Sequence, residues 1–445
     1  MNVLAPSRGV RRPPGPTMST RATIRSIRRH GPTGLLEDVQ RQYPRIAYFR
    51  FGTEHAYLLS EPDLTRLLLV DSARATAKGR GLERAREVLG NGLLTSEGET
   101  HRRQRRLVQP AFHGTRIAGY AEVMAEEAHA LSATWRPGQV VDMPAEMSRL
   151  TLRIVARSLF GTDFSEQDIA LVADSLTAFL GSFLSRMMPI GALLGRLPTA
   201  HNRSLHTALD QLDRLVYRLI AAHRASGDTG DLLSMLLLSP EHEQGMSDQQ
   251  VRDEVLTLML AGHETTADAM CWTWLLLARN PDIATRLREA LAKTPPDPAF
   301  PRAVIAESMR LRPPAWLVSR RALAPLTIDG WLVPPGSLLA ASQWLLHRDP
   351  RWWGDALAFR PERWLAPDGT FHETAPGQPR GAYFPFGAGR RVCIGEHFAW
   401  SELVLVLGIL AVRWQPEVLP ETSDATLAAV TLRPACLPMR LRLWG

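Results

Sequence analysis

The longest hydrophobic pattern in the chain runs from Ser247 to about Asn280. Ser247 followed by Gln250 is a capping-box pattern, and Asn280-Pro281 is a stop signal. The apolar positions between them fall on most faces of a helix: Val251, Val255, Leu258, Met259, Leu260, Trp274, Leu275 and Leu276. A helix that is apolar all round is buried. We therefore expect a helix of roughly 33 residues, about 50 Å long, through the middle of the molecule.

Shorter patterns predict a mostly α-helical chain with a smaller β-rich part. Helical periodicity is predicted over about 115–225, 302–312 and 396–413. Strand-like alternation is predicted at 46–51, 56–59 and, around two turns, 326–342. Residues 1–20 are rich in Arg and Pro and predict a disordered tail, which leaves 21–445 as one domain.

The segment from Asp349 to Gly395 has no clear period and is rich in Pro and Gly. An irregular stretch of about 45 residues inside a compact domain is unusual and is most often functional. Candidate chemistry is therefore sought there first.

Composition adds little to this fold prediction but excludes some functions. The chain is 45% hydrophobic and 22% charged, an ordinary globular balance, and its net charge is +7. The excess is nearly all arginine, since the only lysines are Lys78 and Lys293. No basic patch is interleaved with aromatic residues, so we expect no nucleic-acid partner.

The chain has three cysteines: Cys271, Cys393 and Cys436. A small and odd number of cysteines does not indicate a disulfide framework. They favour a reducing compartment, and we expect a cytoplasmic protein. The N-terminus has no signal-peptide pattern, and no apolar run reaches the ~20 residues that span a bilayer. We therefore expect no membrane anchor.

The irregular segment ends in Phe386-Gly-Ala-Gly-Arg-Arg391-Val-Cys393-Ile-Gly395. Its glycines let the backbone turn tightly, so that amide N–H groups can point at one sulfur. These donors and the following helix N-terminus favour a thiolate at Cys393. The planar guanidinium of Arg391 can donate hydrogen bonds to a carboxylate, and the Phe386 ring can cover the sulfur.

A buried free cysteine in a loop is the simpler interpretation, and we accept it for Cys271 and Cys436. For Cys393 that interpretation does not explain the residues around it. The pattern Phe-x-x-Gly-x-Arg-x-Cys-x-Gly arises by chance on the order of once in ten thousand such chains. The segment resembles the haem-binding signature of the cytochrome P450 family. That resemblance implies an axial thiolate from Cys393 to the iron of haem b (iron protoporphyrin IX), with Phe386, Arg391 and Gly395 around it.

The long helix contains Ala261-Gly262-His263-Glu264-Thr265-Thr266 at its middle. Glycine in a helix costs about 1 kcal/mol relative to alanine, and the threonines can bond back to carbonyls one turn earlier. A Gly/Thr packing contact with a solvated Glu264 remains an alternative. A His-Glu-x-x-His zinc site does not, because the fifth position is Ala267.

This helical segment is similar to the acid–alcohol motif of the same family. The resemblance implies that Glu264 and Thr265 help deliver protons during dioxygen activation. It also implies that Ala261 and Gly262 face the haem and leave room for dioxygen. Many relatives carry Asp where this chain has Glu264.

Two further motifs occur in the family's order. Glu307-x-x-Arg310 precedes Arg360-Pro-Glu-Arg363-Trp, which resembles the Pro-Glu-Arg-Phe element. The resemblance implies a buried structural triad of Glu307, Arg310 and Arg363 that fixes the chain before the cysteine. Isolated Glu-x-x-Arg pairs elsewhere are most simply exposed helical pairs.

Three residues resemble the family's haem-propionate partners. His101 and Arg105 resemble its Trp-x-x-x-Arg element, with His in place of Trp, and Arg320 lies where relatives place a further basic residue. The neighbouring Arg321 leaves a one-residue ambiguity. Each arginine could instead lie on a solvated face.

The resemblance covers roughly residues 30–440. It implies a helix-rich lobe, a smaller β-rich lobe, and a monomeric monooxygenase that receives electrons from a separate ferredoxin and ferredoxin reductase. A peroxide-driven or isomerising relative is an alternative that the Glu264–Thr265 pair disfavours. A non-catalytic haem-thiolate sensor or carrier is another.

The sequence gives little indication of which substrate the protein binds. Apolar segments favour a lipophilic small molecule such as a terpenoid or a fatty-acid-like compound. Plain core packing explains the same residues equally well. The candidate pocket residues are Phe179, Phe183, Trp316, Leu317, Val318, Thr431 and Leu432.

Overall fold

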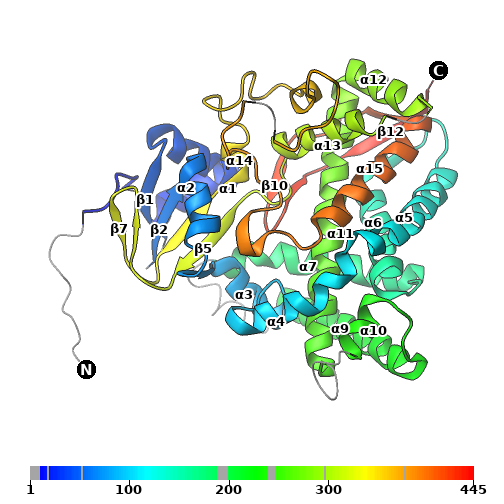
Figure 1. The fold of residues 1–445 in the computed structure, drawn as a ribbon, viewed down its shortest axis with the longest axis horizontal. Coiled ribbons are helices and arrows are strands. Elements are labelled where there is room, and N and C mark those ends of the chain that lie inside the picture. The colour runs from blue at the N-terminus through cyan, green and yellow to red at the C-terminus, as the bar shows by residue number, and fades with distance from the viewer. Residues whose placement is uncertain are drawn as a thin grey trace. The chain divides into compact units, whose positions relative to one another are not determined.

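The computed structural model describes residues 11–17, 20–51, 54–187, 199–238, 246–294, 297–374 and 377–444. The chain forms two compact units. The first comprises Met1–Gly81, Trp316–Ala356 and Gln378–Val392, and the second Leu82–Ala315, Leu357–Gly377 and Cys393–Gly445. Each unit is therefore assembled from segments that are far apart in the sequence (Figure 1).

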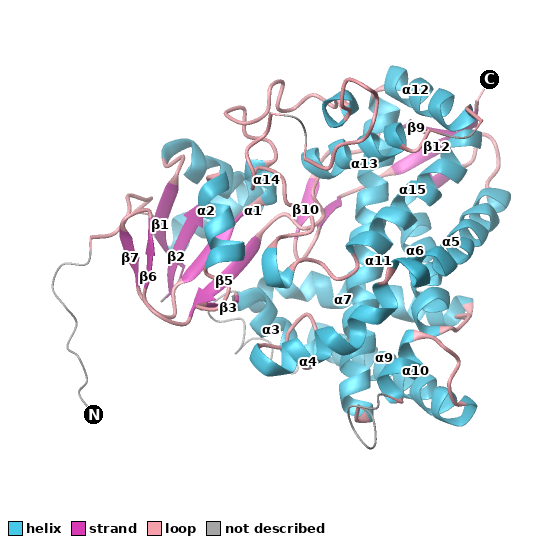
Figure 2. Cartoon of the chain, in the orientation of Figure 1, coloured by secondary structure: helices cyan, strands magenta, loops and turns pink. Residues whose placement is uncertain are grey.

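The first unit is built on a five-stranded sheet in the order β1-β2-β8-β5-β3 (Figure 2). The β2–β8 pair is parallel and the other pairs are antiparallel. Its buried face is apolar and includes Tyr57, Leu59 and Leu339. The strands are β1 (Ile46–Phe51), β2 (Glu54–Leu59), β3 (Thr76–Lys78), β5 (Val318–Ala322) and β8 (Leu338–Ala341).

Short elements complete the first unit. They are helices α1 (Thr20–Gln42), α2 (Pro62–Arg66) and α14 (Gln343–Leu346), a π-helical turn (Leu67–Asp71), a 3-10 turn (Gly389–Arg391) and the hairpin β6 (Leu326–Ile328)–β7 (Trp331–Val333). Helix α3 (Arg80–Leu89) begins in this unit and ends in the second. The strands predicted at 46–51, 56–59 and within 326–342 are thereby confirmed.

Part of the predicted disordered tail is described. The backbone N–H of Tyr48 donates to the carbonyl oxygen of Pro14 at 3.0 Å, so residues 11–17 run beside β1. The rest of the tail, apart from Thr20, lies outside the described residues.

The second unit holds most of the helices. These are α4 (Gly98–Val108), α5 (Gly114–Thr134), α6 (Met143–Phe160), α7 (Glu166–Met187), α9 (Ala200–Ser226), α10 (Leu232–Leu237), α11 (Asp248–Arg279), α12 (Pro281–Ala292), α13 (Ala299–Leu311) and α15 (Glu396–Arg413), with 3-10 turns at Gln109–Phe112 and Pro361–Trp364. Two small sheets accompany them: β4 (Val140–Asp142), β12 (Pro438–Leu443) and β9 (Trp414–Val418), and the pair β10 (Thr426–Ala428)–β11 (Leu432–Pro434).

Helix α11 is the central element of the second unit, as the sequence predicts. It packs against α6, α9, α13 and α15 (Figure 1). Ser247 accepts a hydrogen bond from the N–H of Gln250, whose side chain returns one to the cap, so the predicted capping box is confirmed. The helix ends at Arg279, one residue before the predicted stop.

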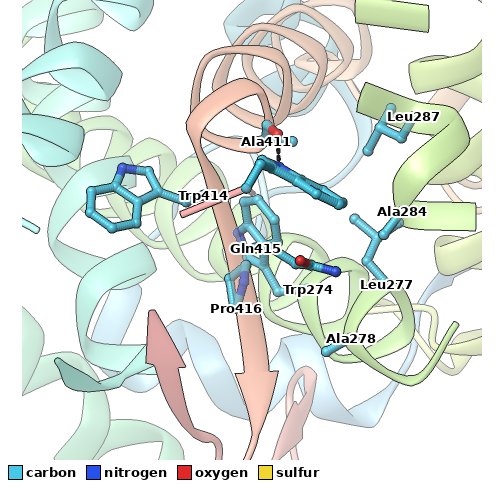
Figure 3. A pocket seen from close by; sticks show the side chains of 10 residues that line it. Trp274, Leu277, Ala278, Ala284, Leu287, Ala411, Trp414, Gln415 and Pro416 are labelled. Atoms are coloured by element: carbon cyan, nitrogen blue, oxygen red, sulfur yellow. Dashed lines mark hydrogen bonds between the residues drawn. The ribbon is translucent and has the colours of Figure 1, made fainter. Parts of the chain in front are cut away.

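A small apolar gap lies at the C-terminal end of α11 (Figure 3). Trp444 closes it by donating from Nε1 to the carbonyl oxygen of Ala411 at 2.8 Å. Trp274, which lines it, is 13 residues beyond Ala261, or about 20 Å along the helix. We interpret the gap as a packing defect, since its walls are core residues: Trp274, Leu277, Ala278, Ala284, Leu287, Ala411, Trp414, Gln415, Pro416 and Trp444.

Among the described residues, no helix is both long enough and apolar enough to span a bilayer.

Candidate active site

The middle of α11 is open although the rest of the helix is buried. Every residue from Val251 to Leu275 is buried except Ala261, Gly262, Glu264 and Thr265. Ala261 is exposed and the other three are partly exposed. We call these four residues the α11 window. An opening midway along a buried helix indicates space for a ligand.

The predicted back-bonding is present within the window. The Thr265 hydroxyl donates to the carbonyl oxygen of Ala261 at 2.7 Å. Gly262, unlike Ala261, faces another helix. A Cβ added to Gly262 would lie 3.0 Å from Cγ2 of Val155 on α6. The missing side chain therefore lets α6 and α11 approach closely, and the free space lies on the Ala261 side.

His263 anchors the window to α6. Its Nε2 lies 2.7 Å from the hydroxyl of Ser148, and the Thr151 hydroxyl donates to its carbonyl oxygen at 3.1 Å. Burial lowers the pKa of His263 to about 4, so the ring is neutral at physiological pH. The carbonyl oxygen of His263 thus accepts a hydrogen bond from α6 next to the window.

Glu264 is a carboxyl group with one protein donor and a raised pKa. The Thr431 hydroxyl donates to Glu264 Oε1 at 3.1 Å. Burial raises the pKa of Glu264, while the charge of Arg433 and the Thr431 hydrogen bond act in the opposite direction. The group is thus held nearer to protonation than an exposed glutamate.

The cysteine loop turns where the sequence predicts. Gly387 and Gly389 have φ values of 74° and 71°, a left-handed conformation that favours glycine. A Cβ on Gly389 would also lie 2.5 Å from the carbonyl oxygen of Leu69 in the first unit. Gly395 differs, because its φ is −90°. Its backbone N–H donates to the sulfur of Cys393.

The Cys393 thiol is exposed on one side, yet protein atoms surround it closely enough to change its acidity. Burial raises its pKa to about 11, and the charge of Glu396 acts in the same direction. The Gly395 N–H and Arg105 oppose that effect without overcoming it. The Gly395 N–H therefore acts in the predicted direction, toward the thiolate, although burial outweighs it in the free chain.

Helix α4 brings basic residues toward the thiol. Burial lowers the pKa of Arg105, and the charge of Cys393 partly restores it, so the two groups lie within electrostatic range. His101, one turn earlier on α4, is buried. Both predicted propionate partners of the second unit therefore lie on the helix next to the cysteine.

Glu307, Arg310 and Arg363 form a dense buried cluster. Arg310 donates to Glu307 through Nε and Nη2 at 2.8 and 2.9 Å, and Arg363 donates through Nε at 2.9 Å. The same carboxylate also accepts from the indole of Trp364 and the backbone N–H of Arg360, each at 2.9 Å. Glu307 and Arg310 are fully buried. The cluster ties α13 to the turn at Pro361–Trp364.

The first unit holds the remaining basic candidates. Arg320 on β5 is 6% exposed. Arg321 points to the other side of the strand, where it donates to Glu54 at 3.2 Å and to the carbonyl oxygen of Gly336 at 2.9 Å. Phe386 and Arg391 lie in the cysteine loop, partly exposed.

The candidate pocket residues have varied surroundings. Phe179 and Leu432 are buried almost completely, and the Thr431 hydroxyl is engaged with Glu264. Leu317 is exposed, Val318 is partly exposed, and Trp316 is 7% exposed. Phe183 lies on α7, but its side chain is outside the described part of the structure.

A family profile for cytochrome P450 matches residues 13–434. The chain belongs to the cytochrome P450 family. It is thus a haem-dependent monooxygenase that uses dioxygen and a redox partner, and its helix-rich architecture with a small β-rich part is that of the family.

Individual relatives agree with this assignment. Cyclooctatin synthase of Streptomyces melanosporofaciens is 41% identical over 85% of this chain and 84% of the relative. Pentalenene oxygenase of Streptomyces avermitilis is 35% identical over 89% of each chain. The crystal structure of CYP175A1 from Thermus thermophilus superposes with a TM-score of 0.77 at 30% identity, covering 94% of this chain and 97% of that one.

The residues present fit a haem. The α11 window and the exposed side of the Cys393 sulfur belong to one unit. Arg105 supplies positive charge beside the thiol for an anionic porphyrin side chain. A thiol neutral at pH 7 also suits an iron ligand, because a bound metal cation deprotonates a coordinating thiol.

Sequence reasoning missed several polar residues around the window. Ser148 and Thr151 bond to His263 from α6. Thr431 was predicted for the pocket wall, but its hydrogen bond to Glu264 was not. Asp268 was also missed, although its position four residues after Glu264 places both carboxyls on one helix face. That spacing was the one available signal.

Replacement of Glu307 by Gln should destabilise the protein strongly. The change leaves two buried guanidinium groups without their carboxylate, at a cost of about 3–5 kcal/mol in the free energy of unfolding. Chemical denaturation followed by circular dichroism measures this loss. The matched control is Glu99→Gln in the exposed Glu99–Arg102 pair, which should change stability by less than about 1 kcal/mol. Equal effects of the two changes would contradict the role of the buried cluster.

Proposed function

We propose that this enzyme oxidises a polycyclic terpenoid at a haem b whose axial ligand is Cys393. The observation that carries the proposal is the α11 window, an opening in a buried helix within the same unit as the partly open Cys393 thiol. Phe386, Gly395 and the rest of the loop would shield the sulfur and hold it toward the iron.

We assign the haem propionates to the basic residues that the motifs single out. His101 and Arg105 are the candidates from α4, and Arg391 is the candidate from the cysteine loop. Arg320 and its neighbour Arg321 are both candidates from β5; Arg321 donates to Glu54 and to Gly336, and Arg320 donates to the carbonyl oxygen of Ser319. The planar guanidinium matches the geometry of a carboxylate.

The haem, when bound, supplies the reductive activation of dioxygen and the insertion of one oxygen atom into a C–H bond of the substrate. The protein supplies the proton donors and the space in which the substrate and dioxygen bind. Burial raises the pKa of Glu264, which favours the protonated form that can act as a proton donor. Thr265 presents its hydroxyl at the window, and its bond to Ala261 fixes the oxygen atom. Ala261 leaves room beside it.

The substrate class rests on the named relatives and on the apolar candidate residues. Cyclooctatin and pentalenene, for which two relatives are named, have polycyclic terpenoid skeletons. Phe179, Trp316, Leu317 and Val318 are the apolar candidates for the pocket wall, and Phe183 is a further one from the sequence. A fatty acid is the alternative substrate.

For partners, we propose a separate ferredoxin with its ferredoxin reductase, and a monomeric, cytoplasmic enzyme. Arg102 and Arg106 are exposed on α4, the helix that also carries Arg105 toward Cys393. A positively charged helix beside the thiol suits an acidic electron carrier.

Replacing Cys393 by Ala should abolish the long-wavelength Soret band of the ferrous–CO complex, because that band requires a thiolate ligand. Cys436→Ala, which removes another exposed cysteine, is the control and should keep the band. A Cys393→Ala protein that retains the band would refute the ligand assignment.

Polycyclic terpene hydrocarbons should bind more tightly than linear fatty acids of equal carbon number, by about ten-fold in Kd. A rigid ring system loses less conformational entropy on binding than a flexible chain. Spectral titration of the ferric enzyme measures both affinities. Tighter binding of the fatty acid would contradict the terpenoid proposal.

Electron transfer from ferredoxin should slow by about ten-fold between about 0.05 and 0.5 M salt, since surface charges separated by more than a Debye length are screened. Stopped-flow reduction of the ferric enzyme measures the rate. Arg102→Gln and Arg106→Gln together should weaken the salt dependence. A rate that is insensitive to salt would exclude docking through these charges.

A further inference from the structure

One face of α11 presents three residues to the segment 431–433. Glu264, Asp268 and Trp272 are spaced by four residues and therefore lie one above another on the helix. The Trp272 indole donates to the carbonyl oxygen of Leu432 at 2.7 Å, and the Leu432 N–H donates to the carbonyl oxygen of Pro314 at 2.9 Å. The segment is thus fixed against the helix from both sides.

This anchoring fixes Thr431 between two carboxyl groups. Its hydroxyl donates to Glu264 Oε1 at 3.1 Å and also lies within hydrogen-bonding reach of Asp268. Thr431 is 5% exposed and Asp268 is 7% exposed. A hydroxyl can donate one hydrogen bond and accept another, so it can join two carboxyl groups.

Asp268 has the surroundings of a protonated carboxyl group. Its Oδ2 has no hydrogen-bond partner among the described residues, which is costly for a buried carboxylate. Burial and the charge of Glu264 raise the pKa of Asp268 well above its ordinary value, while Thr431 and Arg433 oppose the shift. Two carboxyl groups this close do not both ionise readily.

We propose that Asp268 is the internal proton reservoir for Glu264, connected to it through the Thr431 hydroxyl. This inference rests on the proposed role of Glu264 as proton donor. When Glu264 gives up its proton, Thr431 passes its own hydroxyl proton to the Glu264 carboxylate and takes the proton of Asp268. The net change is one proton moved, which leaves Asp268 ionised near Arg433. The pair regains its proton from solvent through the partly exposed Glu264.

Other titratable groups around this face do not replace Asp268. Cys271 on α11 stays a thiol because burial raises its pKa well above the ordinary value. Asp142 acts on Cys271 only as a nearby charge. His263 is a neutral ring directed to Ser148 on α6. Glu402 on α15 is buried, and the side chain that it meets is that of Thr266.

The first experiment measures the protonation of Asp268 directly. Infrared difference spectra of the substrate-free ferric enzyme and its Asp268→Asn variant are recorded at pH 7 in H2O and D2O. We expect the wild type to show a protonated-carboxyl band, shifted in D2O, that the variant lacks. A difference spectrum containing only ionised-carboxylate bands would overturn the proposal.

The second experiment measures coupling, the product formed per pair of electrons consumed. Asp268→Asn should lower coupling by about ten-fold, and the alkaline limb of its pH profile should move to lower pH. The direction follows because Glu264, once ionised, then has no internal proton source. Unchanged ferrous–CO spectra check that the haem site is intact.

Thr431 supplies the matched variants, which also serve if Asp268→Asn does not fold. Thr431→Ser keeps a hydroxyl and should retain coupling, whereas Thr431→Val has nearly the same shape and should lose it about ten-fold. Equal coupling in the two variants would contradict a relay through this hydroxyl.

Glu264→Gln separates this inference from the function on which it rests. If Glu264→Gln loses coupling while Asp268→Asn retains the wild-type value and pH profile, only the reservoir is excluded. If Glu264→Gln also retains full coupling, the proposed donor role of Glu264 fails, and the reservoir fails with it.

Discussion

Polar groups on a buried helix are costly unless other segments satisfy them. The middle of α11 meets this constraint in part, through partners from several elements, while Asp268 Oδ2 has no hydrogen-bond partner among the described residues. Ser148 bonds to Nε2 of His263 and Thr151 to its carbonyl oxygen, Thr431 donates to Glu264, and Trp272 holds the segment that carries Thr431. Each partner comes from a different part of the second unit, so that packing of the unit also assembles the polar groups. The proposed proton supply and the folding of this unit therefore depend on the same contacts.

Much of the architecture could be predicted from local patterns. The capping box and the stop after Arg279 fix the ends of α11 to within a residue, and Glu396–Arg413 was predicted with the bounds it has. These elements are long and strongly apolar, so that local sequence and tertiary packing favour the same structure. The β6–β7 hairpin of the first unit was found through its turn, where Asp329 and Gly330 have positive φ.

The partners of the site could not be predicted in the same way. Thr431 lies more than 160 residues from Glu264, and no local pattern reports a contact across such a distance. Gly262 illustrates a related limit: its helical position suggested room for a ligand, yet the nearest side chain is Val155 of α6. Spacing along a helix shows which residues share a face, but it does not show what that face meets.

The thiol of Cys393 shows how the competition between desolvation and hydrogen bonding depends on atoms that a sequence does not place. The motif supplies an N–H donor from Gly395 and a nearby arginine, both of which favour the thiolate. Burial nevertheless raises the pKa to about 11, so the free chain holds a neutral thiol at pH 7. With Cys393 as the proposed ligand, binding of iron would release the thiol proton, which makes metal affinity increase with pH.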